Sequence, residues 1–270
     1  MKSYFFPLWI VAIGALSLLP FLWFVLTSVK GAAQITAIPP QIIPAFHGDF
    51  YRSAVNEYGL FRYLANSVIV AGSTTLISIA IGALAAYALT RFRFSWTRFY
   101  LMLLLAISMF PQISIAGPVW RILSHLGWLN TYHGITAAYI SLSLPLAIWI
   151  LTTFFRELPY EIEEAAWIDG CSRLQALRKV VLPLAAPGLF TAAILVFIHA
   201  WNEFFFALII LTNSNLQTLP VGIALFPGEY TMPWGEIAAA STMATLPLIV
   251  LTLLFQRRII RGLSAGAVKG

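Results

Sequence analysis

Charged residues are scarce in this sequence. Only 10% of the 270 residues are Asp, Glu, Lys or Arg, whereas soluble domains carry about a quarter. Hydrophobic residues make up 60% of the chain, which is more apolar surface than a soluble fold of this size can bury. The scarcity of charge therefore excludes an ordinary soluble domain and indicates a protein that lies in lipid.

Further absences exclude other classes of protein. The single cysteine, Cys171, excludes an internal disulfide, and no metal-ligand spacing such as CxxC occurs, so we expect no metal site. No phosphate-binding loop of the form GxxxxGKS or GxxxxGKT occurs, so we expect the chain not to hydrolyse ATP alone. The net charge is +6, but Lys and Arg separate apolar runs instead of lining polar faces. This placement indicates membrane orientation and no nucleic-acid partner.

The uncharged runs predict six transmembrane helices, because a bilayer core needs about 20 apolar residues per helix. The expected helices are 6–28, 63–89, 99–117, 134–155, 184–211 and 237–256. The expected outer loops are about 30–61, 118–133 and 212–236. The first run is about twice the length of a signal-peptide core, so we expect the first helix to be retained. We therefore predict an all-α, polytopic membrane protein in which residues 1–270 form one domain.

Four prolines, Pro20, Pro111, Pro145 and Pro247, fall inside the expected helices. In lipid such prolines are expected to kink a helix rather than end it, because neighbouring helices can satisfy the freed carbonyls.

The basic residues predict the orientation of the chain. If the N-terminus is inside, twelve of the 16 Lys and Arg residues fall on inner segments and four on outer ones. The positive-inside rule therefore predicts that both termini are cytoplasmic. The same orientation places the segment between the fourth and fifth helices on the cytoplasmic face.

That segment, "EIEEAAWIDGCSRLQALRKVVLPL" from Glu161 to Leu184, holds four of the ten acidic residues. Pro159 suits a first helical turn, and the glutamates that follow it are favourable near a helix N-terminus. Gly170 suits a helix stop, "SRLQ" from Ser172 matches a capping box, and Pro183 is expected to end the second helix. The pattern predicts two short cytoplasmic helices over about 157–182, lying across the membrane face.

The first of these helices has an unusual face. Ile162, Ala165, Ala166 and Asp169 share one side at helical spacing, and the two alanines leave it shallow. An ordinary interfacial helix puts bulky apolar groups toward lipid and basic groups on its other face. An acidic segment is instead repelled by an anionic inner leaflet. This comparison favours a protein partner over plain lipid contact.

These residues carry a resemblance to a known family. "EAAWIDGCSRLQALRKVVLPLAAPG" resembles the EAA signature of ABC-importer permease subunits, with matches at Glu164, Ala165, Ala166, Asp169, Gly170, Leu182 and Pro183. The stretches "NSVIVAG" from Asn66, "MFPQIS" from Met109, "WNEF" from Trp201 and "GLSAGAVKG" from Gly262 are similar to the maltose/trehalose class of sugar permeases. The resemblance covers essentially the whole chain. One departure is Leu177, where many relatives carry Phe.

The resemblance implies a fold and a function. It implies a type I ABC importer fold and a pore-forming subunit of an ATP-driven, binding-protein-dependent sugar importer in a prokaryotic inner (plasma) membrane. Trehalose and maltose are the favoured substrates. The implied partners are a second homologous permease in a heterodimer, two ATPase subunits, an extracytoplasmic sugar-binding protein or lipoprotein, and membrane lipid. ATP and Mg would belong to the ATPase subunits, so the chain itself would be non-enzymatic and would hold no cofactor.

The resemblance also implies which residues contact these partners. The residues expected to couple to an ATPase subunit are Glu164, Ala165, Ala166, Asp169, Gly170 and Leu177. The cytoplasmic tail, 262–270, is expected to lie between the ATPase subunits and to contact them through Ser264, Gly266 and Lys269. The loop 212–236 is expected to contact the binding protein near Asn213, Asn215 and Glu229.

The residues of a substrate path are less sharply defined. Asn202 and Glu203 beside Trp201 suit sugar hydroxyls and sugar-ring faces, and Asn66 is a weaker candidate. A buried glutamate in lipid is costly, so Glu203 should face the pore, the partner permease or a bond within the chain. Polar residues in membrane helices also join helices to one another, and for Asn66 this packing role is favoured.

Two other classes remain as alternatives. An ion-coupled secondary sugar transporter needs ionisable groups deep in the membrane, and His199, Glu203 and Glu236 are the only candidates. No pair of interrupted segments indicates inverted repeats. A membrane-embedded enzyme would need a cluster of reactive groups, whereas the four histidines are scattered.

Overall fold

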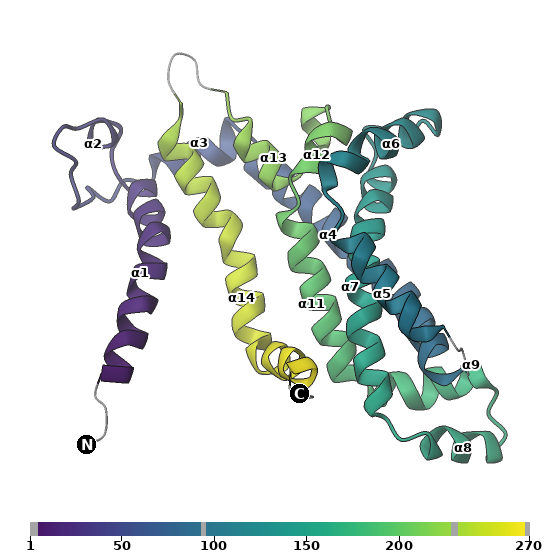
Figure 1. Cartoon of the computed structure of the whole chain (residues 1–270). Coiled ribbons are helices and arrows are strands. Elements are labelled where there is room, and N and C mark those ends of the chain that lie inside the picture. Colours follow the sequence, from purple (N-terminus) through teal and green to yellow (C-terminus); the bar gives the residue numbers. More distant parts are fainter. Residues whose placement is uncertain (1–4, 93–95, 228–231, 268–270) are drawn as a thin grey trace. The chain divides into compact units, whose positions relative to one another are not determined.

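A computed structural model describes residues 5–92, 96–227 and 232–267 of the chain. Every regular element in this described part is a helix, which confirms the all-α prediction (Figure 1). The chain divides into two compact units. Unit 1 consists of residues 1–64 and 219–249, and unit 2 of residues 65–218 and 250–270.

Unit 1 holds the N-terminal helices and the segments that pack with them. Its elements are α1 (Phe5–Ser28), α2 (Ala32–Ile35), α3 (Asp49–Asn56), the first turn of α4 (Leu60–Arg91), α13 (Leu219–Ala224) and the first half of α14 (Trp234–Ala267). Tyr58 joins the segment after α3 to the segment after α13. Its ring stacks on the Phe226 ring with centroids 4.4 Å apart, and its hydroxyl donates to the Pro227 carbonyl at 3.2 Å. The expected outer loops 30–61 and 212–236 contain the helices α2, α3 and α13 and the 3-10 helix η2 (Ser214–Leu216).

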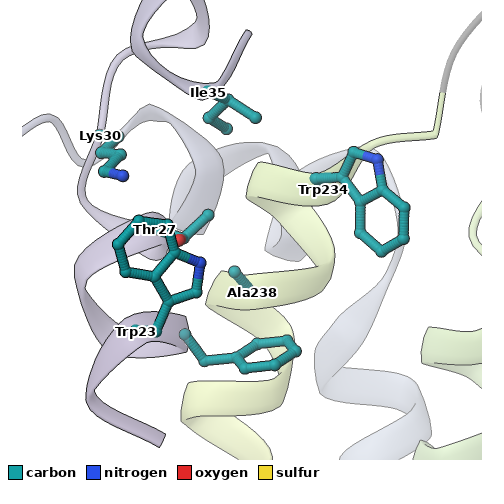
Figure 2. A pocket seen from close by; sticks show the side chains of 7 residues that line it. Trp23, Thr27, Lys30, Ile35, Trp234 and Ala238 are labelled. Carbon is teal, nitrogen blue, oxygen red and sulfur yellow. The ribbon is translucent and has the colours of Figure 1, made fainter. Parts of the chain in front are cut away.

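Unit 1 also has an open pocket of about 340 Å³ (Figure 2). Its walls include Trp23 and Trp234 on facing sides, with Lys30 and Thr27 above and beside Trp23. Lys30 is only 3% exposed, and its ammonium lies 4.3 Å from the centre of the Trp23 ring. This cation–π contact compensates part of the cost of burying the charge. Lys30 is one of the four basic residues of the expected outer segments, and its side chain is buried within unit 1.

Unit 2 contains the remaining helices. They are most of α4, α5 (Thr97–Ser108), α6 (Gln112–His125), α7 (Tyr132–Glu157), α8 (Glu161–Ile168), α9 (Arg173–Ala176), the π-helix η1 (Leu177–Val181), α10 (Leu182–Leu184), α11 (Ala186–Asn202), α12 (Phe205–Ile210), the 3-10 helix η2 (Ser214–Leu216) and the end of α14.

The core of unit 2 lies around α7, against which α5, α11 and α12 pack. One buried cluster joins α4, α7, η1 and α11 through Ala83, Ala86, Tyr87, Leu151, Phe155, Leu177, Val181, Ala185 and Ala192. Four of these nine residues are alanines, which let helix backbones approach closely.

The number of candidate spans reaches the predicted six only when each pair of helices joined by a bend is counted as one span. In the described residues four helices are long and apolar enough to cross a membrane: Trp9–Ser28, Leu60–Arg91, Tyr132–Glu157 and Trp234–Gln256. Two pairs of helices, each bent at a short break, are further candidates by length and composition: 97–108 with 112–125, bent by 92°, and 173–184 with 186–202, bent by 79°. The expected continuous helix 99–117 was therefore wrong. The expected helix 184–211 was wrong as well, because the chain breaks at Glu203 and Phe204, between α11 and α12.

Proline explains the first break. Pro111 has extended backbone angles (φ −60°, ψ 123°) and stands at the N-cap of α6. A proline disfavours helical angles at the residue before it, so α5 ends at Ser108 instead of continuing with a kink. The chain then starts a new helix that runs to His125, inside the expected outer loop 118–133. Pro20, Pro145 and Pro247 do lie inside helices, as expected.

A glycine tests the packing of α7 against α11. A Cβ on Gly188 would lie 2.3 Å from Cγ of Phe154, so Gly188→Ala should overpack this contact and cost about 1–3 kcal/mol of stability. Thermal unfolding of the purified protein in detergent should show a clearly lower Tm. Gly72→Ala is the matched control, because no described atom outside its own helix backbone lies within 4 Å of its Cβ position. Equal Tm values for the two variants would contradict this packing.

Candidate functional site

The charged segment folds as two short helices after the end of α7 (Figure 1). Leu158 is extended, and the carbonyl of Tyr160 accepts bonds from the N–H groups of Glu163 (3.0 Å) and Glu164 (3.2 Å) to start α8. The first turn of α8 therefore carries three glutamates, where the helix dipole favours negative charge.

The turn after α8 forms as the sequence predicts. Gly170 has φ +85°, which a residue with a Cβ adopts only with strain. The N–H of Cys171 bonds to the Ala166 carbonyl at 2.9 Å and that of Gly170 to the Trp167 carbonyl at 3.0 Å. These two bonds form a Schellman motif and satisfy carbonyls at the helix end.

The second helix starts as predicted but ends later. Ser172 Oγ accepts from the Gln175 N–H at 3.3 Å, and Gln175 Oε1 accepts from the Ser172 N–H at 2.8 Å, which confirms the capping box. The helix then passes through a π-helical turn and ends at Leu184. Pro183 does not end it, because a proline in the first turn of a helical segment loses no hydrogen bond there.

Glu163 anchors α8 to the rest of unit 2. It is 1% exposed, and one carboxylate oxygen accepts from the Tyr87 hydroxyl at 2.9 Å. The other oxygen forms an ion pair with Arg91 at the last residue of α4, and Arg91 Nη2 donates to the Leu158 carbonyl at 3.1 Å. A buried pair whose remaining groups are also bonded holds its two helices together, because breaking it leaves an uncompensated charge.

Aromatic rings pack around Arg173, at the start of α9 after the Gly170 turn. The guanidinium of Arg173 lies 4.9 Å from the centre of the Phe92 ring and 5.4 Å from that of Trp167. Tyr160 meets Trp167 edge-on at 5.6 Å. These contacts link the start of α9 to α8 and to the residue after α4.

The exposed face of α8 differs from the predicted one. Its exposed residues are Glu161, Glu164, Ala165 and Ile168, followed by Asp169 and Gly170, and Ile168 is 86% exposed. Ala166 is buried beside Glu163, so the shallow two-alanine face was wrong: the Glu163 ion pair turns Ala166 toward the protein. Leu177 is 2% exposed and belongs to the unit 2 core, so it does not lie on the exposed face.

The three substrate-path candidates from "WNE" lie in different environments. Trp201 is buried and stacks on Phe197 at 5.6 Å. Asn202 is exposed, although its amide donates to the Ile198 carbonyl at 2.8 Å. Glu203 is 7% exposed, and its oxygens accept from the N–H groups of Phe206 (2.9 Å) and Ala207 (3.2 Å) at the start of α12. Glu203 was expected to face the pore, the partner permease or a bond within the chain. The structure shows the third of these, a bond within the chain.

Asn66 joins neighbouring segments of unit 2, as expected for a polar residue that packs helices together. Its amide nitrogen donates to the carbonyls of Asn215 (3.0 Å) and Gln217 (2.8 Å), and its oxygen accepts from the Tyr132 hydroxyl at 2.7 Å. All three bonds tie α4 to the segment before α13 and to the start of α7. Asn66 is therefore committed within the chain and offers little to a substrate.

Comparison with known proteins identifies the family. Residues 78–265 match the family described as "Binding-protein-dependent transport system inner membrane component". The chain belongs to this family. It is 41% identical to the trehalose/maltose transport system permease protein MalG of Thermococcus litoralis, over 96% of this chain and 94% of that one. It is 42% identical to the trehalose transport system permease protein SugB of Mycobacterium tuberculosis, over 94% of this chain and 93% of that one.

The fold of the permease is also that of a solved importer. A chain from the crystal structure of a bacterial ABC transporter involved in the import of the acidic polysaccharide alginate superposes with a TM-score of 0.79. At 22% identity, it covers 93% of the permease and 94% of that chain. The permease is thus a multi-pass inner-membrane protein with an ABC importer permease fold.

The predicted partner contacts outside α8 lie in two segments. Asn213 and Asn215 are exposed, and the Asn213 N–H donates to Asn130 Oδ1 at 2.7 Å, which fixes this end of the loop. Glu229 lies outside the described residues. In the tail, α14 continues past the expected end at 256 and past Gly262 to Ala267, because one glycine costs a helix only about 1 kcal/mol. Ser264 and Gly266 lie on this helix, and Lys269 lies outside the described residues.

Replacing Glu163 tests the anchor of α8. Glu163→Gln leaves Arg91 without its counter-charge, so we expect a loss of about 3–5 kcal/mol of stability and a much lower Tm in detergent. Glu164→Gln is the matched control: it makes the same chemical change on the exposed side of the same turn, and its Tm should change little. An equal Tm for both variants would show that the buried pair does not hold α8.

Proposed function

We propose that this permease is one of two pore-forming subunits of an ATP-driven, binding-protein-dependent importer of a di- or oligosaccharide, with trehalose or maltose favoured. The observation that carries the mechanism is the placement of α8. The helix is fixed to α4 by Glu163 and Arg91, while Ile168, Glu164 and Ala165 on its other side are exposed. A rigidly anchored helix with a free face is suited to receive force from a partner protein.

The substrate class rests on the relatives. Two permeases whose names specify trehalose, or trehalose and maltose, share more than 40% of their residues with this chain over almost its full length. The ion-coupled alternative gains no support from Glu203, the candidate carboxylate at the end of α11. Both its oxygens are bonded to backbone N–H groups of α12 and are unavailable to a transported ion without unwinding that turn.

The partners follow from this assignment. Each of two ATPase subunits would hold ATP and Mg and would receive one coupling helix, from this chain or from a second homologous permease. Closure of the ATPase pair would move α8 and, through its buried ion pair, α4, so that the membrane domain switches between two packings. Both termini are cytoplasmic in this arrangement, in accord with the distribution of Lys and Arg.

The proposed function as a whole can be tested by asking which components transport requires. The permease is reconstituted in liposomes with its partner permease, the ATPase subunits and the binding protein, and uptake of labelled trehalose and maltose is measured. We expect uptake only with all components and ATP. Ion-gradient-driven uptake by this chain alone would reject the proposal.

A bulky residue on the exposed face of α8 tests the coupling contact. Ala165→Trp should leave the chain folded, because this position is exposed, but should disrupt docking by about 2 kcal/mol or more, so that transport falls about 30-fold. Leu254→Trp is the control, because this residue is also exposed but lies in the membrane-spanning part of α14. Normal transport and normal ATPase binding by Ala165→Trp would contradict docking at this face.

Two further contacts can be tested in the same liposomes. Residues 262–270, with Ser264, Gly266 and Lys269, would contact the ATPase pair, and the loop from Asn213 to Glu229 would contact the binding protein. Truncation after Arg261 should lower transport and sugar-stimulated ATP hydrolysis without preventing complex assembly. A crosslinker at Asn215 should capture the binding protein during turnover. Full activity of the truncated chain, or no capture, would refute the respective contact.

A further inference from the structure

A cavity of about 170 Å³ lies in unit 2 at the break between α5 and α6. Four of the residues that line it are polar: Ser108 at the end of α5, Gln112 at the start of α6, Ser141 on α7 and His199 on α11. Phe110, in the break itself, also lines it.

The break lies within the depth of the membrane. The 12 residues of α5 rise about 18 Å, and a bilayer core is about 30 Å thick. Non-helical backbone at this depth persists only where protein or a water-filled cavity covers it. Met109 in the break is 84% exposed, so this chain does not cover it. The break therefore faces either the second permease or a water-filled path between the two.

The polar groups have hydrogen-bonding capacity left toward the cavity. Ser108 Oγ donates to the Leu105 carbonyl at 2.7 Å and Ser141 Oγ to the Ala138 carbonyl at 2.6 Å, so both hydroxyls retain free acceptor lone pairs. Gln112 is exposed, and no described residue bonds its side-chain amide, which offers donors and an acceptor. His199 Nδ1 lies 3.3 Å from Ser143 Oγ, which leaves the other ring nitrogen.

This combination suits a neutral ligand with many hydroxyl groups. The described lining contains no Asp, Glu, Lys or Arg, so the cavity has no full charge to bind an ion. The acceptors suit hydroxyl donors, and the exposed Phe110 ring suits the apolar face of a sugar ring. Whole sites for small molecules span about 300–1,000 Å³, so a cavity of this size holds only part of a disaccharide.

We propose that this cavity is a subsite for one sugar ring on the transport path, formed by Ser108, Gln112, Ser141 and His199 with Phe110 beside the ring. Asn202 lies one turn beyond His199 on α11 and would extend the polar side of the path. The inference rests on the proposed function and adds to it, because it moves the path from Trp201 and Glu203, which are buried, to the break between α5 and α6.

The first test compares uptake by variants of the reconstituted complex. Loss of one hydrogen bond to a neutral hydroxyl should lower trehalose uptake at saturating binding protein about threefold to tenfold in Gln112→Ala and in Ser141→Ala. Ser124→Ala, an exposed serine at the far end of α6, should transport at the original rate. Normal uptake by both cavity variants would overturn the subsite. Absence of uptake by the unaltered complex would instead reject the proposed function.

The second test separates sugar contact from a structural role. In a Cys171→Ser background, Gln112→Cys and Ser124→Cys are each exposed to a water-soluble thiol reagent in the assembled complex. Labelling at position 112 should be slowed at least about threefold by trehalose during turnover, whereas labelling at position 124 should not change. An equal rate with and without trehalose overturns the subsite. No labelling at position 112 also overturns it, because a sugar path must admit water.

Discussion

The buried contact between Glu163 and Arg91 is the constraint on which the end of unit 2 that carries α8 depends. It joins α8 to the last residue of α4, and Tyr87 and the Leu158 carbonyl occupy the remaining bonding positions of the two charges. A buried pair that lacked such partners would cost more than it contributes. Because the pair fixes the rotation of α8, it also decides which residues face outward: Ala166 turns inward and Ile168 outward.

The membrane-spanning part of unit 2 is organised by the same need to satisfy buried polar groups. Glu203 caps α12 where the chain leaves α11, and Asn66 binds two carbonyls of the segment before α13. Each polar side chain replaces water for backbone groups that a bilayer would leave unpaired. Among the described residues no side chain caps the start of α6 at Pro111, whereas Glu203 caps α12. This difference supports the place proposed for the break on the transport path.

The turn and the helix cap of the charged segment were predictable from the sequence. The face that α8 turns outward was not. Gly170 and the Ser172 capping box formed as expected because both depend on residues within one turn. The charge-free runs located the spans, but not the break at Pro111, where the steric effect of proline prevailed over the apolar pattern. Three glutamates in one turn look equivalent in the sequence. Only Glu163 is buried, because its partner Arg91 lies 72 residues away, and no short-range pattern reveals such a pair.

In the proposed mechanism, α8 and α4 move as one body when the partner ATPases close. Distance measurements between spin labels at Ile168 on α8 and Leu84 on α4 test it most directly, because both side chains are exposed and Cys171 can be replaced by serine. The distances are measured in the assembled complex without nucleotide and with ATP trapped. The same distance distribution in both states is expected. A shift of the distribution on ATP binding would show that α8 moves independently of α4, and would contradict the account.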